Sequence, residues 1–179
     1  MSIRVNRTVL DLVEGDLTEQ DTDAIVNAAN KSLLGGGGVD GAIHRAAGPA
    51  LLAECRTLGG CNTGEAKMTR GYDLSATHVI HTVGPVYSGS PRDAELLANC
   101  YRNSLRLARD HNLRSVALPA ISCGVYGYPV GEAAGVALDT VLEFLSENAV
   151  PEKVIFALFS PEHLQAYTRA LEARSEGDP

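Results

Sequence analysis

The sequence has little positive charge. Its 15 lysine and arginine residues are outnumbered by 22 acidic residues, which leaves a formal net charge of -7. Proteins that bind nucleic acids or membrane surfaces through charge usually carry a basic patch, so this composition argues against both classes. It also means that an anionic ligand must be attracted by something other than bulk charge.

Three further patterns are missing. The first 15 residues contain no apolar core of the kind found in signal peptides. No apolar run is long enough to cross a membrane. No cysteine belongs to a CxxC pair or to a Cys/His cluster with zinc-finger spacing, so we expect buried, reduced thiols. These absences predict a cytoplasmic protein without membrane contact. The cysteines concerned are Cys55, Cys61, Cys100 and Cys123.

The 179 residues fit a single domain in which short apolar runs alternate with helical patterns. This alternation predicts an α/β fold with a mostly parallel sheet, and the near-continuous apolarity predicts strands covered on both faces. The predicted strands lie within residues 2–15, 23–30, 66–70, 77–83, 115–121 and 153–159. The predicted helices cover residues 39–58, with an interruption near Gly48-Pro49, then 90–108, 130–148 and a segment that begins at 160.

Two of the predicted helices begin with a Ser-Pro pair. Ser90 suits the N-cap, Pro91 the first helical position and Asp93 the first turn. Ser160 and Pro161 repeat the same opening at the last helix. These signals place the two helix starts more firmly than the hydrophobic period alone.

Two glycine-rich segments follow predicted strands and precede predicted helices. Gly35 to Gly38 form the first, and Gly124 and Gly127 lie in the second. Glycine lacks a Cβ, so a ligand can approach the main chain, and N–H groups at a helix N-terminus attract anions. Ligands of such folds bind at the carboxyl ends of the strands, so the two loops together suit a diphosphate without any basic patch. The alternative for the first segment is a flexible linker, and the alternative for the second is an ordinary turn between a strand and a helix.

Other motifs near the first loop carry less weight. Gly36, Gly38 and Gly41 match the dinucleotide fingerprint G-x-G-x-x-G, but they do not directly follow a strand, and no G-K-[ST] of a P-loop is present. Asp40 and His44 are four residues apart, as two metal ligands on a helix can be, but no third ligand is evident. We therefore expect no metal.

Three motifs resemble those of macro domains and, among these, of the MacroD-type ADP-ribosyl hydrolases. They are EGDLTEQDTDAIVNAANKSLLGGGGVDGAIHRAAG, VIHTVGPVY and LPAISCGVYGYP, and the resemblance extends from about Val9 to Leu171. It implies a three-layer α/β/α sandwich with a mixed, largely parallel central sheet. It further implies a macro domain in residues 1–174 and ADP-ribose in a cleft at the strand ends. The last residues, by their composition, predict a disordered tail at 175–179.

The resemblance also assigns residues to parts of ADP-ribose. Asp16 would accept a hydrogen bond from the adenine amino group, the main chain of Leu17 would face the base, and Phe159 would pack against it. The main chains of the two loops would bind the diphosphate. The residues so assigned are Gly37, Gly38 and Val39 in the first loop and Ser122, Cys123, Gly124, Val125 and Tyr126 in the second.

At the distal ribose the resemblance implies cleavage of an ester, either ADP-ribose on a protein Asp or Glu, or O-acetyl-ADP-ribose. Such an ester needs a positioned water and help with proton transfer, and no metal or cofactor. Asp40 would activate the water, Asn30 would hold a ribose hydroxyl, and Tyr126 would pack on the sugar. Taken alone, Asp40 is also explained as an acid that stabilises a helix start. His78 and His81 are interpreted as structural residues, or as residues that support the catalytic groups without contacting the ligand, rather than as catalytic.

Cys123 departs from the family pattern, because many relatives have threonine there; the change matters little if main-chain N–H groups hold the phosphate. We do not expect Cys123 to act as a nucleophile. The expected partners are ADP-ribose, its esters and mono-ADP-ribosylated proteins, with nucleic acids only as ADP-ribosylated ends. Two alternatives stay open: a module that binds ADP-ribose without catalysis, and a nicotinamide-dependent oxidoreductase that uses the fingerprint glycines.

Overall fold

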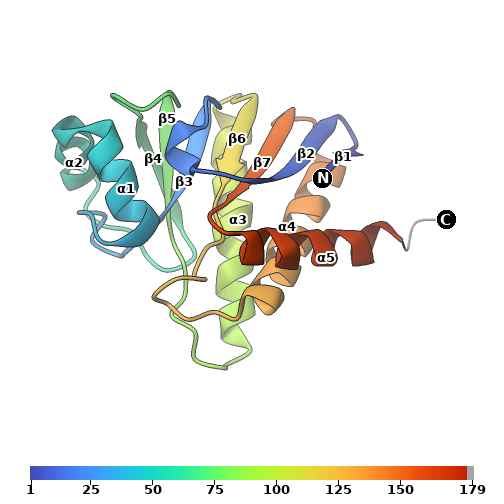
Figure 1. The fold of residues 1–179 in the computed structure, drawn as a ribbon. Coiled ribbons are helices and arrows are strands. Elements are labelled where there is room, and N and C mark those ends of the chain that lie inside the picture. The colour runs from blue at the N-terminus through green and yellow to red at the C-terminus, as the bar shows by residue number, and fades with distance from the viewer. Residues whose placement is uncertain (177–179) are drawn as a thin grey trace.

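The computed structural model describes residues 1–176, in which five α-helices and a short 3-10 helix surround a seven-stranded sheet (Figure 1). The strands are β1 (Ser2–Val5), β2 (Thr8–Glu14), β3 (Ala24–Ala29), β4 (Ala66–Arg70), β5 (His78–Val83), β6 (Ser115–Leu118) and β7 (Lys153–Leu158). The helices are η1 (Leu17–Glu19), α1 (Gly38–Ala47), α2 (Pro49–Arg56), α3 (Arg92–Asp110), α4 (Val130–Glu147) and α5 (Pro161–Ser175).

The sheet is mixed and largely parallel, which confirms the predicted fold class. Its strand order is β1-β2-β7-β6-β3-β5-β4. All neighbouring pairs from β2 to β5 are parallel, and β1 and β4 close the two edges as antiparallel strands. The central strands run in one direction, so the loops that follow β3, β5, β6 and β7 all leave the sheet at the carboxyl ends of the strands. We call this end of the sheet its carboxyl edge.

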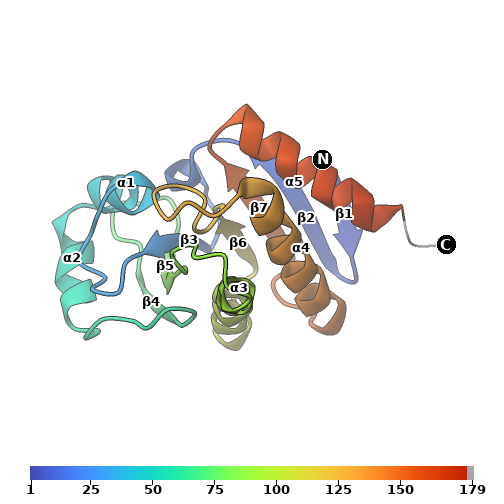
Figure 2. The same cartoon turned by 90° about the horizontal axis from the view of Figure 1, so that it is seen from below.

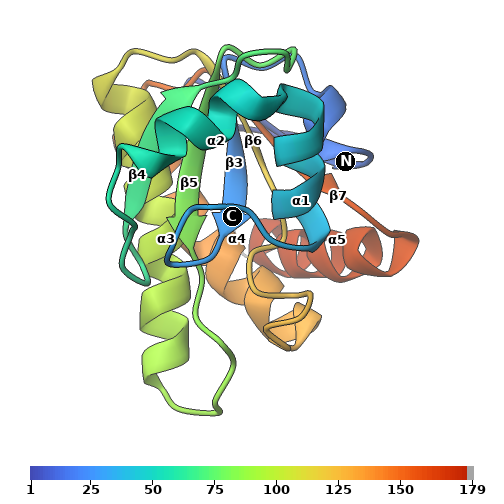
Figure 3. The same cartoon turned by 90° about the vertical axis from the view of Figure 1, so that its left-hand side faces the viewer.

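Helices cover both faces of the sheet, as the three-layer prediction requires. α3, α4 and α5 pack on one face, where Tyr101 and Phe156 lie at the centre of a large apolar cluster. α1 and α2 cover the other face around Ile43, and Figure 3 shows them in front of the strands with α3 behind. Consecutive residues of β3 serve the two layers: Ile25 faces the α1 side, and Val26 faces the α3 side. The uninterrupted apolar run of this strand therefore reflects burial on both faces.

The two Ser-Pro helix starts differ in detail. At α5, Ser160 is the N-cap and its hydroxyl accepts a hydrogen bond from the first turn, with Pro161 as the first helical residue, as predicted. α3 begins one residue later than predicted, at Arg92, and Pro91 occupies the N-cap. The Ser90 hydroxyl still accepts a hydrogen bond from the Arg92 N–H (3.2 Å), so the serine caps the helix from one position further out.

The remaining boundaries follow the predicted breaks. Gly48 separates α1 from α2 with φ at +84°, a backbone conformation that side chains disfavour. α5 continues to Ser175, the first residue of the predicted tail, and residues 177–179 of that tail lie outside the described residues. In the part of the chain that the structure describes, no helix is both long and apolar enough to span a membrane.

Candidate functional site

The loops that the sequence analysis linked to a ligand all lie at one edge of the sheet. η1 follows β2, the first glycine loop follows β3, the second follows β6, and Phe159 follows β7. Figure 2 views the molecule toward this edge and shows the start of α1, the loop before α4 and the start of α5 around a common area. The parallel sheet thus brings segments together that are far apart in the sequence.

Asn30 shapes the first glycine loop. Its Oδ1 accepts hydrogen bonds from the Ser32 N–H (3.1 Å) and hydroxyl (2.6 Å), and its Nδ2 donates to the carbonyl of Gly35 (2.8 Å). Leu33, with φ at +61°, buries its side chain and anchors the loop to the core. The Asn30 amide therefore fixes the main chain of the loop, while one hydrogen of its NH2 group stays free to donate.

The start of α1 leaves main-chain N–H groups open. Gly37 is the N-cap, and no side chain caps this helix. The first helical bond runs from the N–H of Gly41 to the carbonyl of Gly37 (3.3 Å). Among residues 1–176, no acceptor reaches the N–H groups of Gly38, Val39 and Asp40. Open N–H groups at a helix N-terminus favour an anion, so this loop has the properties of an anion site.

Ser122 fixes the second loop against the end of β5. It has φ at +66°, its hydroxyl donates to the carbonyl of Pro85 (2.7 Å), and its carbonyl accepts from the Tyr128 N–H (2.9 Å). Gly84 makes this contact possible, because a Cβ there would collide with Ser122 Oγ and lie 2.6 Å from Ile121 Cγ2. The loop therefore has one defined position relative to the sheet.

This second loop also presents open main-chain N–H groups. In the described chain, those of Gly124, Val125 and Tyr126 have no hydrogen-bond acceptor. The Cys123 side chain instead packs against the main core, and its thiol donates to the carbonyl of Ile121 (3.5 Å). Burial raises the pKa of Cys123 to about 12, so the thiol stays protonated and is a poor nucleophile.

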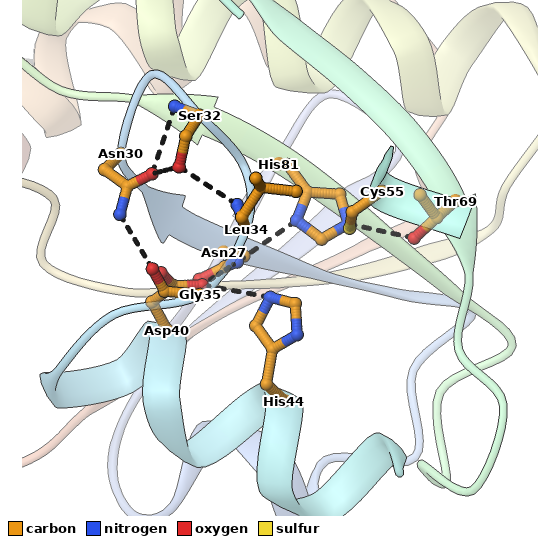
Figure 4. A network of polar contacts seen from close by, with 10 residues as sticks. All are labelled: Asn27, Asn30, Ser32, Leu34, Gly35, Asp40, His44, Cys55, Thr69 and His81. Carbon is orange, nitrogen blue, oxygen red and sulfur yellow. Dashed lines mark hydrogen bonds and ion pairs between the residues drawn. The ribbon is translucent and has the colours of Figure 1, made fainter. Parts of the chain in front are cut away.

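The two oxygens of Asp40, a buried residue (4% exposed), have different surroundings (Figure 4). Oδ1 accepts a hydrogen bond from Asn27 Nδ2 (2.8 Å) and lies 3.4 Å from His44 Nε2. Oδ2 faces the first loop: a Cβ on Gly36 would lie 3.1 Å from this oxygen and 3.3 Å from Asn30 Nδ2. Oδ1 is thus held by the buried Asn27 side chain, and Oδ2 is directed toward the first glycine loop.

The residues predicted to meet adenine lie further along the same edge. Asp16 caps η1, since its Oδ1 accepts from the Thr18 N–H (2.8 Å) and hydroxyl (2.7 Å). Leu17 is buried beneath it, and Phe159 is 89% exposed. Large exposed apolar side chains gather on the loops of this edge, which is typical of a binding surface. They are Leu34 after β3, Val86 and Tyr87 after β5, Val125 after β6 and Phe159 after β7.

A cavity of about 320 Å³ opens beside Tyr126. Lys31 contributes to its lining from the end of β3, and residues 83–86 line it from the end of β5. Asp93 lies at the same cavity, where its carboxylate accepts hydrogen bonds from the N–H groups of Ser88 (2.8 Å) and Gly89 (3.0 Å). These bonds hold the pKa of Asp93 below its usual range. The cavity therefore adjoins Tyr126, one of the three residues expected around the distal ribose.

Asn27 was not recognised as part of the site from the sequence, and for His81 a supporting role was left open beside a purely structural one. Both are buried, and they are direct neighbours on the parallel strands β3 and β5. A signal for them is present: each is a polar residue inside an otherwise apolar strand, and a buried polar group requires a partner. Residues 1–176 contain no group of three His, Cys, Asp or Glu side chains arranged to hold a metal, although Asp40 and His44 do meet.

A parallel α/β sheet with open main-chain N–H groups on two loops at its carboxyl edge defines a domain of the nucleotide-binding class. The chain belongs to the macro domain family, whose family model, described as "Macro domain", matches residues 26–137. The O-acetyl-ADP-ribose deacetylase of Salmonella typhimurium is 53% identical over 175 residues, which are 95% of this chain and 97% of that protein. The human ADP-ribose glycohydrolase MACROD2 is 55% identical over 89% of this chain, which spans 38% of that longer protein.

Solved structures agree with this assignment. The Oceanobacillus iheyensis macrodomain with ADP superposes with a TM-score of 0.96 at 47% identity, covering 99% of this chain and 97% of that one. The Trypanosoma brucei macrodomain in complex with ADP-ribose gives a TM-score of 0.86 at 46% identity, covering 90% and 68% of the two chains. The similarity thus extends over nearly the whole described fold.

Proposed function

We propose that this protein binds ADP-ribose at the carboxyl edge of its sheet and hydrolyses esters at the distal ribose. The substrates are ADP-ribose attached to acidic side chains of proteins and O-acetyl-ADP-ribose. The names of the deacetylase and glycohydrolase relatives support the reaction class, and the solved macrodomains with ADP and ADP-ribose support the ligand. ADP-ribosylated proteins are the proposed macromolecular partners, and the cytoplasmic location stays a prediction.

Open main-chain N–H groups support the proposed binding of the diphosphate. In the first loop the proposed ligands are Gly37, Gly38 and Val39. In the second they are the residues from Ser122 to Tyr126, of which Gly124, Val125 and Tyr126 have open N–H groups and Cys123 donates its N–H to the carbonyl of Ala120 (3.4 Å). Amide groups can hold an anion without a basic side chain, which suits a chain with a net charge of -7. Adenine would then lie near η1, between Asp16 with Leu17 on one side and the exposed ring of Phe159 on the other.

The surroundings of Asp40 carry the proposal of catalysis. With Oδ1 held by Asn27, Oδ2 is the oxygen available to accept a proton from a water molecule as that water attacks the ester. The bond between the acyl carbon and the ribose oxygen breaks, the carboxylic acid leaves with the hydroxyl of the water, and the ribose oxygen receives the proton that Asp40 accepted. Asn30 would donate its free hydrogen to a ribose hydroxyl, and Tyr126 would pack on the sugar. A positioned ester needs this proton transfer and no metal or cofactor.

The test is a panel of ADP-ribosyl substrates: glutamate esters on a peptide, O-acetyl-ADP-ribose, an N-glycoside and a nucleic acid with a terminal ADP-ribosyl phosphate. Release of ADP-ribose is followed over time by chromatography. We expect turnover of the esters. Tight binding of ADP-ribose without release from any substrate would instead identify a non-catalytic reader. A change in the absorbance of a reduced nicotinamide cofactor would favour the oxidoreductase alternative, and we expect none.

Asp16→Ala is expected to weaken ADP-ribose binding by about 1.5–3 kcal/mol, the scale of a lost hydrogen bond to a charged group. This corresponds to a roughly 10- to 150-fold increase in Kd, which isothermal titration calorimetry can measure. Asp16→Asn is the matched control, because its side-chain oxygen can still accept from the Thr18 N–H and cap η1, while the second acceptor oxygen is replaced by an NH2 group. An unchanged Kd in the alanine variant would show that Asp16 does not contact the base.

A further inference from the structure

A chain of polar side chains crosses the sheet beneath the first glycine loop (Figure 4). It begins at Asp40 on α1, whose Oδ1 accepts from Asn27 on β3 (2.8 Å). Asn27 Nδ2 also lies 3.1 Å from Nδ1 of His81 on β5. The other ring nitrogen of His81, Nε2, lies 2.9 Å from the hydroxyl of Thr69 on β4. The chain thus joins three neighbouring strands to the proposed catalytic carboxylate.

This polar chain lies among apolar side chains in the part of the sheet next to α1 and α2. Ile25 and Val79 lie beside it, and Asn27 and His81 are 0% exposed. A buried polar group without a partner costs roughly 1–3 kcal/mol in proteins, and apolar side chains would fill the same space without this cost. The polar chain therefore calls for an explanation beyond packing.

Each hydrogen bond in the chain can run in one direction only. The Asp40 carboxylate accepts, so Asn27 must turn its NH2 group toward it. The second hydrogen of that NH2 group then points at His81 Nδ1, which must carry a lone pair. The ring proton is therefore on Nε2, which donates to Thr69, and the Thr69 hydroxyl donates to the carbonyl of Arg70 (3.1 Å). In the described residues Asn27 Oδ1 has no partner, so its two NH2 bonds alone set its orientation.

His81 remains neutral in these surroundings. Burial, with a smaller contribution from His44, lowers the pKa of His81 to about 3. The titratable groups near it include Asp40 and His44 on α1 and Cys55 on α2, whose Sγ lies 3.8 Å from His81 Nε2. Lys67 is the residue opposite His81 on β4, and its ammonium group donates to the carbonyls of Leu58 and Gly60. Burial raises the pKa of Cys55 to about 11, so this thiol is also uncharged at neutral pH. The Nδ1 lone pair is thus available whenever the protein is folded near neutrality.

We infer that His81 is a positioning residue for ester hydrolysis. Its Nδ1 holds the Asn27 amide, and the amide holds Asp40 Oδ1, so that Oδ2 stays directed at the glycine loop. Thr69 selects the ring tautomer that makes this arrangement possible. The inference rests on the proposed role of Asp40, and His81 itself lies too deep to contact the nucleotide.

Two pairs of variants separate this role from packing. His81→Leu removes the acceptor for Asn27, whereas His81→Asn can restore it with the side-chain oxygen near the position of Nδ1. Thr69→Val removes the acceptor for Nε2 at almost constant volume, whereas Thr69→Ser keeps a hydroxyl. For each variant, kcat and KM are measured with O-acetyl-ADP-ribose, Kd with ADP-ribose, and folding by thermal unfolding.

We expect His81→Leu to lower kcat about 10- to 100-fold, the effect of a slightly misplaced reacting group, with KM and Kd changed less than about twofold. His81→Asn should recover most of kcat, and Thr69→Ser should stay near the wild type. If His81→Leu does not fold, Thr69→Val still tests the inference, because it leaves Asn27 and its partners in place and should lower kcat by freeing the other tautomer.

Nitrogen-15 NMR of the histidine rings gives a readout independent of turnover. We expect His81 to carry its proton on Nε2 in the wild type, and a mixture of tautomers in Thr69→Val. A proton on Nδ1 in the wild type, or an unchanged kcat in a folded His81→Leu variant, would overturn the inference while leaving the proposed function intact. A wild-type protein that hydrolyses none of the esters would overturn the proposed function, and the role of His81 with it.

Discussion

Replacing Asp40 with alanine is expected to slow ester hydrolysis at least about a hundredfold, the usual scale for loss of an acid–base group. The substitution removes Oδ2, the oxygen that faces the glycine loop and that would accept the proton of the attacking water. ADP-ribose binding should weaken by less than about tenfold, or 1.4 kcal/mol, because the diphosphate is held by main-chain groups of other residues. Single-turnover rates with O-acetyl-ADP-ribose and calorimetric Kd values measure the two effects separately.

Asp40→Asn serves as the control for this result. It keeps nearly the same volume and an oxygen that can accept from Asn27 Nδ2, so the surroundings of the site are preserved while the charge is lost. Activity as low as that of the alanine variant would assign the effect to the carboxylate. Full activity in Asp40→Ala would mean that Asp40 only stabilises the start of α1, the simpler explanation that the sequence left open.

Gly84→Ala is expected to disturb the second loop from a distance. The new methyl group would collide with Ser122 Oγ and crowd Ile121, so the hydroxyl bond that holds the loop to Pro85 must break. Overpacking of this kind destabilises a protein by about 1–3 kcal/mol. We expect the Kd for ADP-ribose to rise at least about tenfold, because the N–H groups of the loop lose their fixed position. Urea unfolding and calorimetry record the two effects.

Gly131→Ala is the matched control for this variant. Gly131 lies in the first turn of α4, its Cβ would meet no atom within 4 Å, and alanine is the better helix former by about 1 kcal/mol. It should therefore leave both the loop and the ligand affinity unchanged. If Gly84→Ala lowers stability while Kd stays constant, the position of the second loop does not govern binding.

Much of the fold could be predicted because its determinants are local. The apolar run of β3 and the Ser-Pro opening of α5 each carry their signal within a few adjacent residues. The alternation of such segments leaves few ways to arrange them, since parallel strands need crossover helices on the faces of the sheet. The predicted start of α3 was wrong by one residue. Pro91 is the N-cap and not the first helical residue, and the Ser90 hydroxyl caps the helix from the position before it.

The site could be predicted only in part. The glycine run and Asp40 are adjacent in sequence, so their association was visible without coordinates. Asn27 and His81 are 54 residues apart and meet only because β3 pairs with β5 in a particular register. The same holds for Gly84, whose small size matters because Ser122 packs against it. These relations depend on strand order, which the sequence pattern does not specify.

The open amides of the two loops have a consequence for the kinetics of the protein. A peptide N–H neither gains nor loses a proton across the pH range in which proteins stay folded. The lysine and histidine side chains that bind phosphate in other proteins do change their protonation. Affinity for the diphosphate should therefore be nearly constant from acid to alkaline solution. Whatever pH dependence turnover displays would then originate in the side chains around the nucleotide and at the reacting sugar, and not in the groups that hold the diphosphate.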